Sequence, residues 1–110
     1  MSDHLERFMQ GWMSDDLDMI LDACAADFVY DDPIDGRFNK TEFADYYRGL
    51  VRSDPVFCDL VITKADGQEK AWCWWAWKPA GAAEWAQQGS SLSKGSADGV
   101  HSDVIAYYRR

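Results

Sequence analysis

Ala26-Asp27-Phe28-Val29-Tyr30-Asp31-Asp32-Pro33 is the stretch that decides the fold, because a short β-favouring run ends there at a proline. Side chains alternate between the two faces of a strand, so Phe28, Tyr30 and Asp32 share one face. Gly36 then provides a turn that sends the chain back. The stretch predicts a short strand and hairpin with an aspartate at the end of the strand.

Three apolar stripes with helical spacing surround this strand. The first comprises Leu5, Phe8, Met9, Trp12 and Met13, the second Leu17, Ile20, Leu21 and Cys24, and the third Phe43, Tyr46, Tyr47, Leu50 and Val51. Ser14 or Asp15 can cap the second helix. Asn39, with Glu42 three residues further on, has the spacing of a capping box before the third helix. We expect two helices before the strand and one after the hairpin.

The second half of the chain has the pattern of an antiparallel sheet. Candidate strands cover about 56–65, 69–78, 84–94 and 100–109. Asp66-Gly67 and Asp98-Gly99 are tight-turn dipeptides, and Pro79-Ala80-Gly81 provides the turn between the middle strands. No linker or repeat divides the chain, so residues 1–110 are expected to form a single α+β domain.

One candidate strand, Ala71-Trp72-Cys73-Trp74-Trp75-Ala76-Trp77, is apolar on both faces. Alternation puts Cys73, Trp75 and Trp77 on one face, and the opposite face then carries Trp72 and Trp74. An antiparallel sheet wetted on one side would not have this pattern. We expect the helices to cover one face and a second copy of the chain to cover the other, giving a homodimer through Trp72 and Trp74.

The composition excludes several classes of partner. A formal net charge of −8 disfavours nucleic acid and anionic membrane surfaces. The chain has no apolar run near the ~18 residues that a membrane span needs and no export leader, which favours a cytoplasmic protein. The three cysteines lack metal-binding spacing, and His4 and His101 are the only histidines. No metal or other cofactor is therefore expected.

Five segments, taken in order, carry a resemblance to a known family. They are Asp15-Asp16-Leu17-Asp18, residues 26–33, Gly36-Arg37, Asp98-Gly99-Val100 and Ala106-Tyr107-Tyr108. Together with the order of elements, they resemble the SnoaL-like and ketosteroid-isomerase-like branch of the nuclear transport factor 2-like superfamily. The resemblance covers nearly the whole chain and is more specific for fold than for chemistry.

This resemblance implies a cone-shaped, cystatin-like fold, in which three N-terminal helices pack on a strongly curved antiparallel sheet. It also implies an apolar cavity for a small hydrophobic molecule. The residues expected to line that cavity are Phe8, Trp12, Phe28, Trp75, Trp77, Gln88, Ser90 and Tyr108. Members of the family often dimerise through the outer sheet face, in agreement with the two-faced tryptophan strand.

Asp32 is the first candidate catalytic residue. It matches the position of the general-base aspartate of ketosteroid isomerases, immediately before the same proline. A carboxylate at an aromatic cavity wall is desolvated, which makes it a better base. The alternative is that Asp31 and Asp32 only form the turn, by accepting hydrogen bonds from nearby backbone.

The electrostatic partners of such a base depart from the family pattern. The oxyanion tyrosine of the isomerases matches Phe8, and their proton-donating aspartate falls near Ser90, so steroid isomerisation is disfavoured. Tyr47 matches a tyrosine that supports the oxyanion site, and Tyr30 shares a face with Asp32. Both tyrosines are candidate partners, although each could equally be a core residue with its hydroxyl at the rim.

The last strand offers a further acid. SnoaL-like cyclases use an acid–base aspartate in the second half of the chain, which makes Asp103 a conceivable substitute. The family pattern, however, turns Val104, Ala106 and Tyr108 inward, which would leave His101 and Asp103 on the outer face.

Three functions remain open from the sequence. The first is a cofactor-independent isomerase, cyclase or lyase that uses Asp32 as general base on a carbonyl or polycyclic substrate. The second is a ligand-binding or accessory domain that keeps the pocket without the chemistry. The third is an interaction module whose tryptophan strand is the functional surface.

Overall fold

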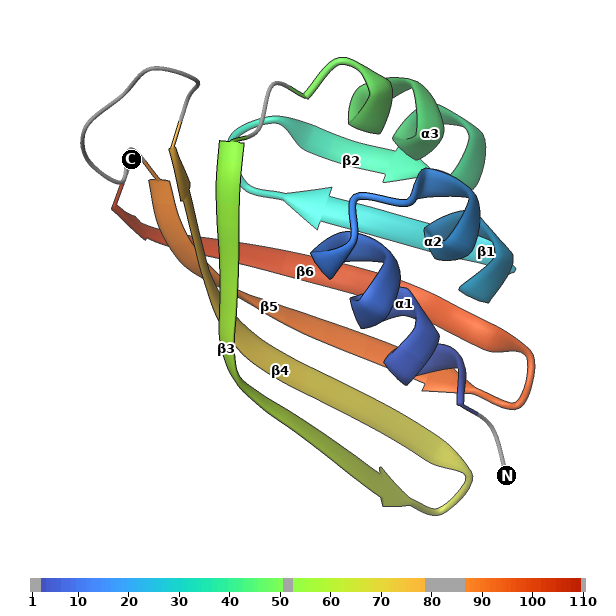
Figure 1. Cartoon of the computed structure of the whole chain (residues 1–110). Helices are drawn as coiled ribbons and strands as arrows, with labels where there is room; N and C mark the ends of the chain where they lie inside the picture. Colours follow the sequence, from blue (N-terminus) through green and yellow to red (C-terminus); the bar gives the residue numbers. More distant parts are fainter. Residues whose placement is uncertain (1–2, 51–52, 79–86, 110) are drawn as a thin grey trace.

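A computed structural model describes residues 3–50, 53–78 and 87–109, which form three helices and six strands (Figure 1). The helices are α1 (His4–Met13), α2 (Leu17–Ala23) and α3 (Lys40–Arg48). The strands are β1 (Cys24–Asp32), β2 (Gly36–Asn39), β3 (Ser53–Ala65), β4 (Gln68–Lys78), β5 (Gln87–Ser96) and β6 (Gly99–Arg109).

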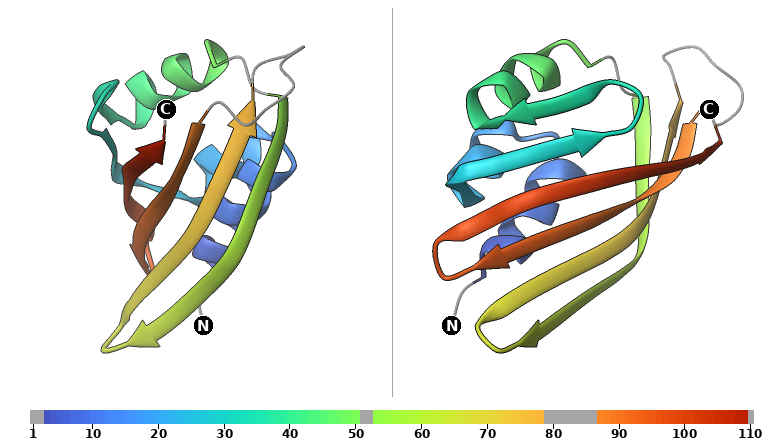
Figure 2. Two further views of the ribbon diagram at one scale, coloured as in Figure 1. Left: turned by 90° about the vertical axis from the view of Figure 1, so that its left-hand side faces the viewer. Right: turned by 180° about the vertical axis from the view of Figure 1, so that it is seen from behind.

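The strands form one sheet in the order β2-β1-β6-β5-β4-β3. Neighbouring strands are antiparallel, except that β1 and β6, the first and last strands in the chain, run parallel. Two opposite views show that the sheet is curved and that the helices lie on one side of it (Figures 1 and 2). The expected α+β cone, with three helices on a curved sheet, is confirmed.

The helices bury their apolar stripes against the concave face of the sheet. The largest buried side chains of this core are Leu5, Phe8, Ile20, Phe28, Phe43 and Val100. Their burial removes apolar surface from water, which is the main favourable contribution to folding. No helix among the described residues is long and apolar enough to cross a membrane.

The ends of the helices differ slightly from the expectation. The cap of α2 is Asp16, which accepts a hydrogen bond from the Met19 N–H, rather than Ser14 or Asp15. Cys24 begins β1 instead of extending the α2 stripe. The capping box of α3 forms as predicted between Asn39 and Glu42.

The hairpin between β3 and β4 has the turn that its sequence predicts. Asp66 and Gly67 both have positive φ angles, of 53° and 75°, as a two-residue hairpin turn of this type requires. The proposed Pro79-Ala80-Gly81 turn and the predicted strand residues 84–86 lie outside the described residues.

The expected orientation of the last strand is wrong, because β6 contains an extra residue. Val100 pairs with Gly95 and Ser102 pairs with Lys94, so His101 is an additional residue in β6. A bulge of this kind shifts all the residues that follow it to the other face. Asp103 and Ile105 are consequently buried on the concave side, whereas Val104 and Ala106 are exposed.

The convex face carries an apolar row across four strands. The register pairs Val61 with Trp72, Trp72 with Leu92, and Leu92 with Val104. Trp74 lies beside this row, with its ring 5.2 Å from that of Trp72. As the sequence predicts, β4 therefore presents tryptophan on its outer face.

Candidate functional site

Asp32 ends β1 on the concave face and is 2% exposed. Its Oδ1 accepts hydrogen bonds from the backbone N–H groups of Ile34 (2.9 Å) and Asp35 (3.0 Å). Its Oδ2 accepts from the hydroxyls of Tyr107 (2.6 Å) and Tyr30 (3.3 Å). Four donors stabilise the carboxylate against the cost of burial. One oxygen of Asp32 therefore forms the turn, as in the turn-forming alternative, and the other faces two tyrosine hydroxyls.

Tyr107 belongs to a row of residues on the inner face of the sheet. The register pairs Phe57 with Trp75, Trp75 with Gly89, and Gly89 with Tyr107. Gly89 has no side chain, and a Cβ built there would lie 2.6 Å from the Trp75 indole. The indole therefore occupies this space and meets the Tyr107 ring edge-on, with centroids 5.4 Å apart.

The indole Nε1–H of Trp75 is a buried hydrogen-bond donor that has no acceptor among the described residues. A buried donor left without a partner is costly, and such groups often mark a binding position. The Trp75 N–H is thus a candidate donor to a bound polar atom.

A second carboxyl group lies on the same face. Asp103 is 2% exposed and pairs in register with Tyr30 of β1. The Ser93 hydroxyl donates to its Oδ1 at 3.0 Å. Burial raises the pKa of Asp103 to about 7, and the hydrogen bond from Ser93 opposes this shift. Near neutral pH this acid can hold or release a proton.

The two tyrosines between these acids keep their protons. Burial, together with the nearby carboxylates, raises the pKa of Tyr30 well above its usual value. The same causes raise the pKa of Tyr107, and its hydrogen bond to Asp32 adds to the effect. Both hydroxyls therefore act as donors in the resting protein.

The predicted aromatic lining forms the core beside this site. Phe8 and Phe28 are fully buried, and Trp12 is 9% exposed and stacks on Tyr30. Trp75 is partly buried against the same cluster. The side chains of Trp77 and Tyr108 lie outside the described residues.

Three polar candidates lie elsewhere. The Tyr47 hydroxyl donates to Asp15 Oδ1 (2.5 Å), at the turn between α1 and α2. Ser90 pairs with Trp74 on the convex face. Gln88 has the same strand parity as Ser90, so the expectation that Gln88 and Ser90 face the interior is wrong.

The inward serines of β5 are Ser91 and Ser93, which are 8% and 1% exposed. β5 therefore inverts the usual pattern, because Leu92 faces out into the apolar row while Ser93 faces in and bonds Asp103. Among the described residues, no three His, Cys, Asp or Glu side chains are grouped to hold a metal ion.

Comparison with known families decides the relationship. A model of the SnoaL-like domain matches residues 5–109. The chain belongs to this family. A comparison with curated protein sequences finds no match.

Solved structures similar to this SnoaL-like domain share its fold at low sequence identity. A protein with a ketosteroid isomerase-like fold from Catenulispora acidiphila, in complex with trimethylamine, has a TM-score of 0.75 and 13% identity, covering 97% of this chain and 86% of its own. A protein from Pseudomonas putida, proposed to be a polyketide cyclase, has a TM-score of 0.72 and 12% identity, covering 96% and 89%. At this identity the likeness establishes the fold alone.

Sequence reasoning missed two residues of the site in this SnoaL-like chain. The sequence pattern predicts Asp103 on the outer face and assigns no role to Tyr107. A regular alternation from Val100 turns both residues outward, and only the extra residue at His101 reverses it. The serine-rich inner face of β5 was the available signal for a buried polar partner.

Proposed function

We propose that this SnoaL-like domain binds a small apolar carbonyl compound at its concave face and transfers protons at the carbon next to the carbonyl. Asp32 is the general base, and no cofactor takes part. The observation that carries the proposal is the hydrogen bond that Tyr107 donates to the buried Asp32 carboxylate. The Tyr107 ring is itself part of a partly buried aromatic surface.

Tyr107 is the member of this pair that lies nearer the surface, since Asp32 is 2% exposed and Tyr107 is only partly buried. A substrate that contacts the Tyr107 oxygen could pass a proton to it while the hydroxyl proton moves to Asp32. This concerted relay needs no direct contact between the substrate carbon and Asp32. It supports a role for Tyr107 as a relay between the substrate and the base.

The developing enolate needs a hydrogen-bond donor, and Phe8 cannot provide one. The Trp75 N–H is buried and has no acceptor in the part of the chain that the structure describes, and the Trp75 ring contacts Tyr107. We assign this N–H to the substrate oxygen. Asp103, protonated below a pKa of about 7, is a second acid on the same face that could return a proton to the product.

The test uses 1-tetralone, an apolar ketone with exchangeable α-protons, as probe. Titration into the ¹⁵N-labelled protein should shift the indole N–H signal of Trp75, which Trp75→Phe identifies by its loss. Trp74→Phe is the matched control, because Trp74 lies on the convex face. An unmoved Trp75 signal at a ketone concentration that shifts other resonances would remove the proposed donor.

A second candidate function is ligand binding without turnover. The observation in its favour is that Asp32 Oδ1 is engaged by Ile34 and Asp35, as in a turn-forming aspartate. In that case the ketone would bind, but its α-protons would exchange no faster with the protein than without it.

We also propose that the domain is a homodimer through the convex face. The row of Val61, Trp72, Leu92 and Val104 carries no charge. Within it Leu92 and Val104 are 37% and 42% exposed, and Trp74 beside it is 37% exposed. Isolated large apolar patches are uncommon on monomers. A second copy related by a two-fold axis would cover this row with an identical one.

A further inference from the structure

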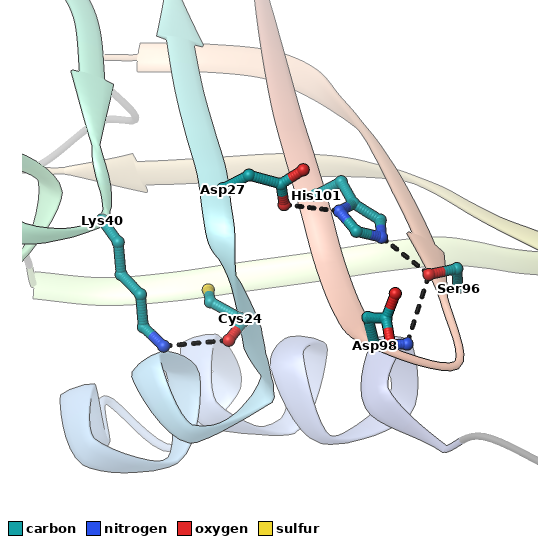
Figure 3. A network of polar contacts seen from close by, with 6 residues as sticks. All are labelled: Cys24, Asp27, Lys40, Ser96, Asp98 and His101. Carbon is teal, nitrogen blue, oxygen red and sulfur yellow. Dashed lines mark hydrogen bonds and ion pairs between the residues drawn. The ribbon is translucent and has the colours of Figure 1, made fainter.

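Three polar side chains meet on the convex side of the sheet, away from Asp32. Figure 3 shows Asp27 of β1, His101 of β6 and Ser96 at the end of β5 in one row. Asp27 Oδ1 lies 2.6 Å from His101 Nδ1, and Ser96 Oγ lies 2.6 Å from His101 Nε2. In this arrangement the hydroxyl of Ser96 has the place of a nucleophile, the imidazole of His101 that of its base, and the carboxylate of Asp27 that of the acid that orients the base.

The positions of these residues depend on two irregularities of the sheet. His101 is the extra residue of β6 opposite β5. On the other side, β1 advances five residues from Cys24 to Val29 while β6 advances only two, from Val100 to Ser102. Asp27 lies within this widened part of β1, opposite His101. Bulges of this kind re-aim side chains and are common beside functional sites.

The two contacts of His101 match one tautomer of the neutral imidazole. An ionised Asp27 can only accept, so the hydrogen bond between them places a proton on His101 Nδ1. In the neutral imidazole, Nε2 then accepts the hydroxyl proton of Ser96. The Asp98 N–H donates to Ser96 Oγ at 3.2 Å and so stabilises negative charge on that oxygen.

We propose that Ser96 is a nucleophile for acyl transfer from small carboxylic esters, with His101 as its general base and Asp27 as the group that orients His101. Ser96 Oγ attacks the ester carbonyl carbon while His101 Nε2 takes the hydroxyl proton. The bond from this carbon to the leaving alcohol breaks, and His101 returns the proton to the alcohol oxygen. His101 then deprotonates a water molecule, whose oxygen bonds to the acyl carbon. The bond from this carbon to Ser96 Oγ breaks, Ser96 Oγ takes the proton back from His101, and the carboxylic acid leaves.

The surroundings define the kind of ester. The Asp27 and His101 side chains are 73% and 33% exposed, so the site is open to water. An open site gives little binding energy or water exclusion, and it suits short, unhindered acyl groups with good leaving groups. Acceleration is expected to come mainly from general base catalysis, which contributes about 10²–10⁴-fold.

The test uses p-nitrophenyl acetate and a fluorophosphonate label on the full chain. The label should attach to Ser96, as located by peptide mass spectrometry, and ester hydrolysis should follow the same residue. Ser96→Ala should abolish the labelled peptide and lower hydrolysis at least ~10-fold, and His101→Gln should do the same. Asp27→Asn should slow labelling by ~10-fold or more while leaving Ser96 in place.

A matched control separates this site from non-specific reactivity. Ser102→Ala removes the serine next to His101 in β6 and should not change labelling. Thermal unfolding of each variant shows that it is folded. Labelling spread over several residues, or hydrolysis unchanged in folded Ser96→Ala, would overturn the proposal. Asp32→Asn should leave labelling intact, so the outcome is independent of the concave site.

Discussion

The Tyr107 hydroxyl donates to Asp32 Oδ2 over 2.6 Å, between residues 75 positions apart in the chain. This hydrogen bond ties the last strand to the end of the first and places a protonated phenol against a buried carboxylate. The proposed site needs both residues. Asp32 is nearly inaccessible, and Tyr107 contacts both Asp32 and the partly buried Trp75 ring.

Tyr107→Phe should keep the fold and apolar ligand binding but strongly reduce proton exchange in a bound ketone. Loss of a hydrogen bond to a charged group should also lower the free energy of unfolding by about 1.5–3 kcal/mol. NMR exchange and urea denaturation measure the two effects. Tyr46→Phe is the control, because the Tyr46 hydroxyl donates to the exposed Asp35. Equal effects of both variants on exchange would contradict the role of Tyr107.

Gly89→Ala should disturb the site through packing. A Cβ there would lie 2.2 Å from the Ala106 carbonyl oxygen and 2.6 Å from the Trp75 indole. We expect a loss of about 1–3 kcal/mol in the free energy of unfolding and a displaced Trp75 N–H resonance. Gly49→Ala is the control, since its nearest contact is an ordinary 3.5 Å. A Gly89→Ala protein as stable as the wild type would show that the inner row is not closely packed.

Asp103→Asn should change how stability depends on pH. Folding raises the pKa of Asp103 from 3.8 to about 7, so the folded protein holds a proton that the unfolded chain releases. The contribution of this group is fully present below about pH 4 and is lost as pH rises through about 7.

Asparagine does not titrate, so the variant does not lose this contribution to stability as pH rises. Its side-chain oxygen can still accept the hydrogen bond from Ser93. The variant should therefore gain stability relative to wild type between pH 4 and 7, by roughly 1–4 kcal/mol at pH 8. Denaturation at a series of pH values measures the difference. A constant difference between the two proteins from pH 4 to pH 8 would mean that Asp103 does not titrate in this range.

Leu92→Glu should separate the proposed dimer, because Leu92 lies in the apolar row between Trp72 and Val104. Light scattering at micromolar concentration should give twice 12.5 kDa for the wild type and 12.5 kDa for the variant. Lys94→Glu, on the same face of β5 beyond the row, is the control for added negative charge. A monomeric wild type would refute this assembly.

The sequence is informative where local chemistry determines structure. Periodicity placed the three helices, Asn39 with Glu42 predicted a cap, and Asp66-Gly67 predicted a hairpin turn; the structure confirms all three. The alternation of Phe28, Tyr30 and Asp32 also correctly placed the acid on the concave face.

The rest of the site depends on register, which local patterns do not determine. One extra residue at His101 turns Asp103 inward, and nothing in the residues around it marks a bulge. The inward direction of Ser93 follows from the same pairing, since its partner in the register is Asp103. The contact of Tyr107 with Asp32 needs the parallel pairing of β1 and β6, a long-range feature of the whole sheet.

The central claim is that Asp32 is a base, and α-proton exchange of 1-tetralone in D₂O, followed by ¹H NMR, tests it most directly. Wild-type protein should accelerate the exchange above the buffer rate, and Asp32→Asn should abolish the acceleration. The amide keeps the shape of the side chain but cannot take a proton, so the Trp75 N–H should still shift on ketone binding. Exchange that is equally fast with Asp32→Asn, or no faster with wild type than in buffer while the ketone binds, would contradict the claim.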